Sequence, residues 1–386
     1  MTPFRGGLAA ARAVLAEHWG YAGFRAAQVR VLGPLLAGRD VLAVLPTGAG
    51  KSLCYQVPAL LASGLTLVVS PLISLMQDQV GALQRRAIAA AYLTSALTLE
   101  QRRTVLRSVT AGAVRLLYCA PEGLAGLTRR LRAAGTSVSL FAVDEAHCIV
   151  EWGNEFRPHY RDLGKHRYLL GSPPTIALTG SATAPARNEI LTVLGIRHAD
   201  VVVTSFDRPN LRFVVERVRD DRARFGRVRE LIRRTDGHTL VYTPTRRLAE
   251  LVTRALLQRS VRAAPYHAGL TPGVRRLVLR AFLQDDVWVI VATTAFGMGI
   301  DKPDVRRVIH WGPSHTLEGY YQEAGRAGRD GRPAECLMLW RREDLAWGEI
   351  RPEMRRYVKA RRCRRAALLE YFGERLERCS GCDVCG

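Results

Sequence analysis

The sequence predicts a mixed α/β fold in which two consecutive parallel-sheet domains are followed by a small helical segment rich in cysteine. Short apolar runs alternate with longer stretches of helical spacing, the alternation restarts near residue 207, and four of the eight cysteines crowd the last 24 residues. Strands that alternate with helices form a parallel sheet covered on both faces. We therefore expect sheet domains at residues 1–206 and 207–340, and a helical metal-binding subdomain at residues 341–386.

The strands of the first domain are expected where short, almost wholly apolar runs occur. These runs are residues 41–45, 65–69, 115–119, 140–143 and 175–178. Helical spacing lies between them, at residues 53–61, 73–86 and 98–111. Because apolar runs of this length are typical of strands buried on both faces, the helices are expected above and below the sheet.

The second domain repeats this pattern after a turn-rich joint at residues 207–210. Its strands are expected at residues 238–242, 261–266, 287–291 and 305–310, and its helices at residues 246–259 and 272–283. A charged pattern then predicts one further helix at residues 354–372, with Cys363 inside it.

The composition is that of a folded chain with a strongly basic surface. Hydrophobic residues make up 48% of the 386 positions and charged residues 24%, and the formal net charge is +22. Phosphates favour such a chain through counterion release, so a nucleic acid is the expected partner. Since all but four of the basic residues are arginine, genomic base composition stays open as a second source of the charge. We find no signal peptide and no apolar run of about 18 residues, and expect a location in the cytoplasm at the nucleoid.

A glycine-rich segment after the first expected strand has the pattern of a phosphate-binding loop. Residues 45–52 read L-P-T-G-A-G-K-S and lead into a helix. Glycines let backbone N–H groups face phosphate oxygens, Lys51 can reach the β- and γ-phosphates, and Ser52 can ligate Mg²⁺. Leu45 stands where the strict pattern has glycine, a departure that the helicase form of the loop shares. The candidate nucleotide-binding residues are Thr47, Gly48, Gly50, Lys51 and Ser52.

A pair of carboxylates follows the apolar run at residues 140–143. Asp144 and Glu145 begin the tetrad D-E-A-H at the point where a parallel sheet places its ligands. We expect Asp144 to hold Mg²⁺ and Glu145 to polarise the attacking water. Together with the loop at residues 45–52, the pair predicts hydrolysis of a nucleoside triphosphate.

With these motifs the chain resembles the RecQ family of DNA helicases over essentially its whole length. The resemblance implies that both sheet domains are RecA-like. It also makes residues 19–28 an adenine-reading segment, in which Tyr21 stacks on the base, Arg25 stacks or pairs nearby, and Gln28 bonds both donor and acceptor edges. From the residues alone, Tyr21 and Phe24 could equally belong to the core.

The same resemblance assigns contacts with DNA and their coupling to hydrolysis. Residues 68–79 contact the DNA backbone, the aromatic-rich loop at residues 148–160 senses single-stranded DNA, and residues 181–183 link hydrolysis to domain movement. Packing of the aromatic loop on its own domain remains the alternative for that segment. The implied residues are Ser70, Gln77, Trp152, Phe156, Arg157, Ser181, Thr183 and His267.

In the second domain, residues 289–306 and 320–331 are long matches to the family. The resemblance places Gly299 and Asp301 at the nucleotide. It makes Arg329 the arginine finger that stabilises charge on the γ-phosphate, and Arg326 a γ-phosphate or inter-domain partner. Such a finger is worth about 10³–10⁵ in rate.

Four cysteines near the end can supply four thiolates, the number that a tetrahedral structural Zn²⁺ requires. Cys379, Cys382 and Cys385 are spaced two residues apart, and Cys363 lies fifteen intervening residues upstream. A labile disulfide pair and an iron–sulfur cluster are the alternatives. Together with residues 371–374, the cluster resembles the RecQ zinc-binding subdomain.

The sequence therefore predicts an ATP-dependent DNA helicase that moves 3′→5′ on single-stranded DNA and separates duplex in repair or recombination. Its cofactors would be ATP, Mg²⁺ and Zn²⁺, and its partner single-stranded or forked DNA. We expect a monomer, with a single-stranded-DNA-binding protein as the candidate protein partner, and a short form without winged-helix and C-terminal helical domains. Two alternatives stay open: an RNA helicase of the same superfamily, and a DNA-stimulated ATPase with weak or no unwinding.

Overall fold

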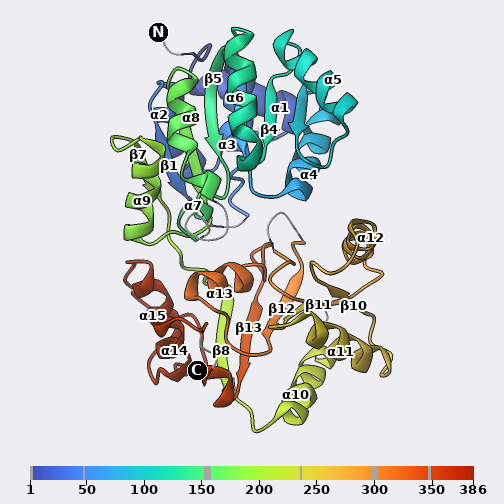
Figure 1. Cartoon of the computed structure of the whole chain (residues 1–386). Coiled ribbons are helices and arrows are strands. Elements are labelled where there is room, and N and C mark those ends of the chain that lie inside the picture. Colours follow the sequence, from blue (N-terminus) through green and yellow to red (C-terminus); the bar gives the residue numbers. More distant parts are fainter. Residues whose placement is uncertain (1–2, 47, 152–157, 235–236, 298–301, 347–348) are drawn as a thin grey trace. The chain divides into compact units, whose positions relative to one another are not determined.

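The computed structural model describes residues 3–46, 48–151, 158–234, 237–297, 302–346 and 349–386 (Figure 1). These residues form two compact units, Met1–Ser205 and Phe206–Gly386. Each unit has its own parallel sheet and its own core. Among the helices that can be described, none has the length and apolar character needed to cross a membrane.

The first unit is built on a seven-stranded sheet in which all the pairings are parallel. Its strands, in spatial order, are β3 (Ala90–Leu93), β4 (Leu116–Cys119), β2 (Leu65–Val69), β5 (Val138–Val143), β6 (Thr175–Thr179), β1 (Val41–Val44) and β7 (Asp200–Val203). The register pairs Val44 with Thr179 and Val69 with Val143, so the carboxyl ends of the central strands lie together. The candidate catalytic segments follow these ends.

Helices cover both faces of this sheet. They are α1 (Leu8–Trp19), α2 (Ala26–Leu36), α3 (Leu53–Leu61), α4 (Ile73–Gln84), α5 (Leu99–Thr110), α6 (Leu124–Ala133), α7 (Cys148–Glu151), α8 (Leu163–Leu169) and α9 (Ala184–Leu194), with 3₁₀ turns η1 (Pro121–Gly123) and η2 (Pro158–Tyr160). One buried cluster joins residues of α1, α2, α3 and α4 to alternate residues of the central strands. Right-handed crossovers place α6, α8 and α9 on the opposite face, because those connections run in the other direction along the sheet.

The second unit has a six-stranded sheet, again with parallel pairings throughout. In spatial order its strands are β10 (Ala263–Tyr266), β11 (Val289–Ala292), β9 (His238–Tyr242), β12 (Val305–His310), β13 (Ala334–Trp340) and β8 (Leu211–Arg217). Its helices are α10 (Asp221–Arg233), α11 (Arg246–Leu257), α12 (Pro272–Leu283), α13 (Leu317–Ala324), α14 (Pro352–Lys359) and α15 (Arg364–Tyr371), with the 3₁₀ turn η3 (Glu343–Ala346). The cysteine-rich end belongs to this unit: Cys382 forms a bridge to Phe213 of the edge strand β8.

The expected single helix at residues 354–372 is wrong. The structure has two helices, α14 and α15, separated at Ala360–Cys363. Cys363 is the N-cap of α15 and not an interior residue, and its Sγ accepts the backbone N–H of Ala366. The break follows from this cap, because a residue whose side chain accepts a helix-start N–H has non-helical backbone angles.

Candidate active site and metal centre

The glycine-rich loop follows β1 directly and leads into α3. The Leu45 N–H donates to Thr179 O at 3.0 Å, which extends β1 by one residue before the chain turns. Gly48 and Gly50 have φ angles of 83° and 74°, values that favour glycine. The Lys51 ammonium donates one hydrogen bond to Leu45 O at 3.3 Å, so it lies folded over its own loop. Thr47 lies outside the described residues.

The N-terminal segment is fastened to this loop. The Arg25 guanidinium donates to Gly48 O at 2.6 Å, and the Gln28 amide donates to Ala49 O and Gly50 O at 3.2 and 3.1 Å. Gln28 Oε1 accepts the Arg25 N–H at 2.9 Å, which caps α2. A Cβ at Gly50 would lie 2.6 Å from Gln28 Nε2, so glycine is needed there for space as well as for φ. Gln28 thus holds the loop in shape, a contact that the adenine-reading prediction did not include.

Tyr21 and Phe24 differ in exposure. Tyr21 is 55% exposed, as a ring available for stacking must be. Phe24 is half-buried and packs against the core cluster of the first unit. Phe24 therefore packs with the core and Tyr21 does not, and the stacking of Tyr21 on adenine stays a prediction.

The two carboxylates stand at the end of β5, where the Asp144 N–H donates to Val69 O at 2.9 Å. Asp144 is buried, and its Oδ1 accepts the Glu145 N–H at 3.0 Å. Burial, together with the charge of Glu145, raises the pKa of Asp144 to about 7, while Lys51 opposes the rise. Two adjacent carboxylates with few positive charges beside them are suitable ligands for a hard divalent cation. Asp144 and Ser52 are the residues that would hold Mg²⁺.

A chain of hydrogen-bonding side chains leads from the carboxylates to the next strand. His147 Nδ1 lies 3.4 Å from Glu145 Oε2 and 3.0 Å from Thr179 Oγ1. Thr179 Oγ1 donates to Ser181 O at 2.9 Å and accepts the Ser181 N–H at 3.3 Å. Glu145 is therefore connected to residues 181–183 through two buried side chains. Sequence reasoning assigned no role to either one, although His147 completes the D-E-A-H tetrad.

The remaining residues expected to contact DNA differ in burial and in their hydrogen-bond partners. Ser70 is buried at the end of β2, Gln77 is half-buried in α4, and Thr183 caps α9 by accepting the Ala186 N–H at 3.4 Å. His267 is also buried, and its Nε2 lies 3.3 Å from Glu250 Oε1. Several expected site residues lie outside the described residues, namely Trp152, Phe156, Arg157, Gly299 and Asp301.

In the second unit, the two candidate arginines occupy the turn that follows α13. Arg326 is buried beside the Tyr242 hydroxyl; burial raises the pKa of that phenol, and the charge of Arg326 opposes the rise. Arg329 is half-buried one turn further along. Glu323 anchors the same helix, because its carboxylate accepts hydrogen bonds from His310 Nε2 at 2.9 Å and Ser314 Oγ at 2.8 Å.

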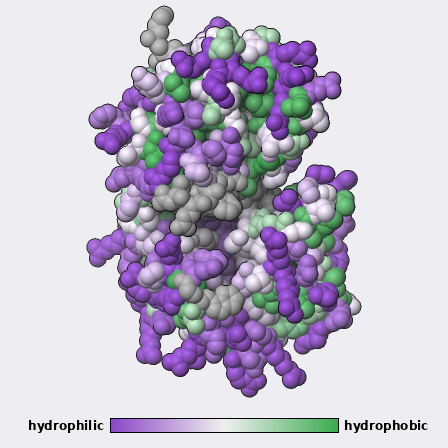
Figure 2. All heavy atoms as spheres, in the orientation of Figure 1, coloured by the Kyte–Doolittle hydropathy of each residue, from purple (hydrophilic) through white to green (hydrophobic). Residues whose placement is uncertain are grey.

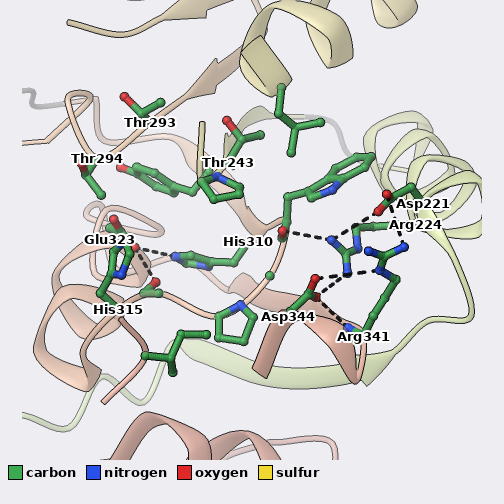
Figure 3. Close-up of a pocket in the computed structure, with 18 residues that line it drawn as sticks. Asp221, Arg224, Thr243, Thr293, Thr294, His310, His315, Glu323, Arg341 and Asp344 are labelled. Carbon is green, nitrogen blue, oxygen red and sulfur yellow. Dashed lines mark hydrogen bonds and ion pairs between the residues drawn. The ribbon is translucent and has the colours of Figure 1, made fainter. Parts of the chain in front are cut away.

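A cavity of about 200 Å³ lies beside this anchor, at the carboxyl ends of β9, β11 and β12 (Figure 3). Thr243, Thr293 and Thr294 line one side of it. On the other side, buried Arg224 is paired with Asp344 and donates to Trp311 O at 3.2 Å. Most charged groups that line the cavity are thus paired with one another. These pairs hold β12 and α13 in position.

The four C-terminal cysteines converge. Their Sγ atoms all lie within 4.8 Å of one another. Burial raises the pKa of Cys382, but backbone hydrogen bonds to its sulfur outweigh burial and lower the pKa to about 7. The Cys385 thiol instead donates to Cys382 and Cys363, which raises its own pKa to about 12. Thiols this close cannot all ionise without a cation between them, and four thiolates fit a tetrahedral Zn²⁺.

A second group of potential ligands does not form a metal site. His238, Asp285 and Asp304 also bring their ligand atoms within 4.8 Å of one another. The Lys302 ammonium, however, contacts both carboxylates. A buried lysine already supplies the positive charge that a metal would bring.

Comparison with known proteins places these features in one family. Three family models match the chain: DEAD/DEAH box helicase at residues 25–191, helicase conserved C-terminal domain at residues 223–331, and RecQ zinc-binding at residues 351–386. The ATP-dependent DNA helicase RecQ of Synechocystis is 42% identical over 83% of this chain and 69% of its own length. The chain belongs to the RecQ helicase family. This confirms the resemblance.

Other RecQ proteins match over nearly all of this chain. The ATP-dependent DNA helicases RecQ of Haemophilus influenzae and Pasteurella multocida are 39% and 40% identical over 97% and 96% of it. The chain spans 63% and 61% of the length of these two relatives. The RecQ zinc-binding match includes all four cysteines, which confirms Zn²⁺ as the metal of the cluster.

Solved structures show the same fold at lower sequence identity. Mycobacterium smegmatis helicase Lhr, bound to ssDNA and AMP-PNP, has a TM-score of 0.68 at 24% identity and covers 89% of this chain and 49% of its own. The DUF1998 helicase MrfA bound to DNA gives 0.73 at 19%, with coverage of 88% and 53%. These likenesses, with the two sheets of this RecQ chain, confirm the predicted class: two RecA-like α/β domains followed by a zinc-binding region.

Proposed function

We propose that this RecQ chain is an ATP-dependent DNA helicase that moves 3′→5′ on single-stranded DNA and separates duplex. The observation that carries the proposal is the group at the carboxyl edge of the first sheet. There, Lys51 on a glycine-rich loop, the Asp144–Glu145 pair and the His147–Thr179 connection meet. Family membership supports DNA as the polymer, and the 3′→5′ polarity is part of the proposal.

The residues divide the chemistry among themselves. The loop N–H groups and Lys51 bind the phosphates, and Glu145 orients and polarises the attacking water. Bound Mg²⁺, held by Asp144 and Ser52, would neutralise charge on the phosphate oxygens. Arg329, supplied by the second unit, stabilises the charge that develops on the γ-phosphate, with Arg326 beside it.

Coupling to DNA follows from the connection between strands. Glu145 contacts His147, which contacts Thr179, and Thr179 is bonded to the backbone of Ser181. A shift at residues 181–183 would change the orientation of Glu145, and with it the rate of hydrolysis. We propose that DNA bound near Ser70, Gln77 and the aromatic loop produces this shift.

The surface hydropathy does not by itself define a DNA path. Hydrophilic residues are spread over much of the visible face of both units (Figure 2). The formal net charge of +22 therefore supports affinity for phosphates in general, and specificity for DNA must come from the site.

Steady-state ATP turnover and strand separation on a forked duplex test the proposal together. We expect single-stranded DNA to stimulate turnover and the fork to open only with hydrolysable ATP. Stronger stimulation by RNA would favour the RNA-helicase alternative. Turnover without strand separation would reduce the function to that of a DNA-stimulated ATPase.

A further inference from the structure

The segment that opens the second unit holds the arginine-bearing turn. The Arg208 guanidinium donates to Gly325 O at 3.3 Å, to Ala327 O at 3.1 Å and to Gly328 O at 3.0 Å. Asn210 Nδ2 donates to Gly328 O at 2.8 Å. These carbonyls lie at and beyond the C-terminal end of α13, where helix carbonyls lack partners and a cation is favoured. Two side chains thus fix the backbone on both sides of Arg326 and directly before Arg329.

The fit at Gly328 is close. Its φ is 55°, and a Cβ there would lie 2.5 Å from Asn210 Nδ2 and 2.8 Å from Arg332 O. The turn can therefore approach Asn210 only with glycine at this position. Asn210 Nδ2 and Gly328 O are hydrogen-bonded, so Asn210 contributes to the position of the backbone directly before Arg329.

The zinc-binding region in turn holds Arg208. Arg365 of α15 is 1% exposed, and its guanidinium donates to Arg208 O at 2.8 Å and to Leu211 O. It also pairs with Asp207 and lies over the Phe213 ring, 5.5 Å from the centroid. Within the described part of the chain, its hydrogen bonds go to the Asp207 carboxylate and to the carbonyls of Arg208 and Leu211.

A second contact strengthens this attachment. The Phe206 ring stacks on Phe372 with centroids 4.6 Å apart, and the Phe206 N–H donates to Glu374 Oε2 at 2.6 Å. Tyr321 of α13 donates its hydroxyl to Phe206 O at 2.9 Å. Residues 206–211 are therefore bonded to the zinc-binding region on one side and to α13 on the other.

We infer that Arg208 is a positioning residue for Arg326 and Arg329, and that Arg365 of the zinc-binding region holds Arg208 in place. The zinc-binding region then acts on ATP hydrolysis through this chain of contacts, at a distance from nucleotide and DNA. The inference rests on the proposed function, because it requires Arg329 to be the arginine finger. It assigns neither Arg208 nor Arg365 to contact with the substrate.

Arg208→Ala tests the inference through its kinetics. Misplacement of a catalytic group by about 1 Å costs about 10²-fold in rate. We expect kcat for DNA-stimulated ATP hydrolysis to fall by about 10–100-fold while KM for ATP stays within about twofold. Arg208→Lys should recover part of kcat, since an ammonium can satisfy one or two of the three carbonyls but lacks the fork of a guanidinium. Arg262→Ala is the matched control: Arg262 also donates to a main-chain carbonyl, that of Asp285, far from the turn in sequence.

A double-mutant cycle separates positioning from a general structural role. In a background that carries both Arg326→Ala and Arg329→Ala, Arg208→Ala should lower kcat by less than about twofold more, because both groups that it positions are gone. A full additional loss in that background, or unchanged kcat in the single variant, overturns the inference. If Arg208→Ala unfolds, Asn210→Ala serves in the same cycle. Full activity of Arg329→Ala alone would instead contradict the finger assignment in the proposed function.

Discussion

At the scale of single residues, the first unit shows how neighbours set the chemistry of a site. Burial, and then the charge of the adjacent Glu145, raises the pKa of Asp144 to about 7, and Lys51 opposes the rise only in part. Lys51, the cation of this site, folds back on Leu45 O. Bound Mg²⁺ would supply the positive charge that Asp144 lacks. A bound phosphate would give the Lys51 ammonium an anionic partner in place of Leu45 O.

Lys51→Ala should lower ATP turnover by about 10²–10³-fold, the usual cost of losing one preorganised group that stabilises charge. DNA binding should persist, since Lys51 serves phosphate at the nucleotide. Thermal unfolding should change little, because one side chain to main chain hydrogen bond is worth about 1 kcal/mol. Turnover and DNA affinity are measured together, with exposed Lys165→Ala as the control. Full turnover in Lys51→Ala would refute the phosphate-loop assignment.

Thr179→Val tests the connection from Glu145 to residues 181–183. Valine keeps the shape of threonine but removes the hydroxyl that contacts His147 and Ser181. We expect stimulation by single-stranded DNA to fall several-fold more than basal turnover. The matched control is Thr175→Val on the same strand, whose hydroxyl bonds Arg167 and Pro173 instead. Equal loss of basal and stimulated rates would show that Thr179 is merely structural.

At the scale of elements, strands with a strongly apolar run and helices with clear helical spacing could be predicted from the sequence. Strands whose apolar run is weak, alternating or interrupted by a charged residue were missed. Strands β9 and β12 and helices α3 and α12 have their expected bounds. No strand was expected at β3, β8 or β13. β3 is a short edge strand that is largely half-buried, β8 alternates buried and exposed residues at the other edge, and β13 carries Glu335 among its apolar residues.

Site residues divide in the same way. The phosphate loop and the carboxylates could be predicted because their chemistry needs fixed residue types at fixed spacing. The contacts His147–Thr179 and Arg208–Gly328 could not, since each joins segments far apart in the chain. Residues 207–210 read only as a joint, because side-chain hydrogen bonds to carbonyls leave no periodic pattern.

Removal of zinc should destabilise the second unit. Asp383, next to Cys382, bonds the edge strand twice, through its N–H to Phe213 O and its carboxylate to the Val215 N–H. Cys382→Ser or chelation should therefore lower the unfolding temperature and, through residues 206–211, reduce ATP turnover. Metal analysis should find about one zinc per folded chain. An unchanged unfolding temperature after complete zinc removal would contradict this account.

At the scale of the whole molecule, the proposed function assigns complementary parts of one reaction to the two units. The first holds the phosphate loop, the carboxylates and the connection to residues 181–183. The second holds Arg326 and Arg329. Arg208 and Arg365 connect the backbone around these two arginines to the zinc-binding region. Under the proposed function, efficient hydrolysis requires the residues of both units at the same nucleotide, and we propose that DNA controls the rate by controlling that encounter.

The measurement that tests this most directly is ATP turnover with and without single-stranded DNA, for the unmodified chain and for Arg329→Ala. We expect strong stimulation by DNA in the unmodified chain. In the variant, stimulated turnover should fall by about 10³-fold or more while ATP binding is retained. DNA-independent turnover in the unmodified chain would contradict the proposed coupling of hydrolysis to DNA. Full stimulation in Arg329→Ala would contradict the assignment of Arg329 as the arginine finger.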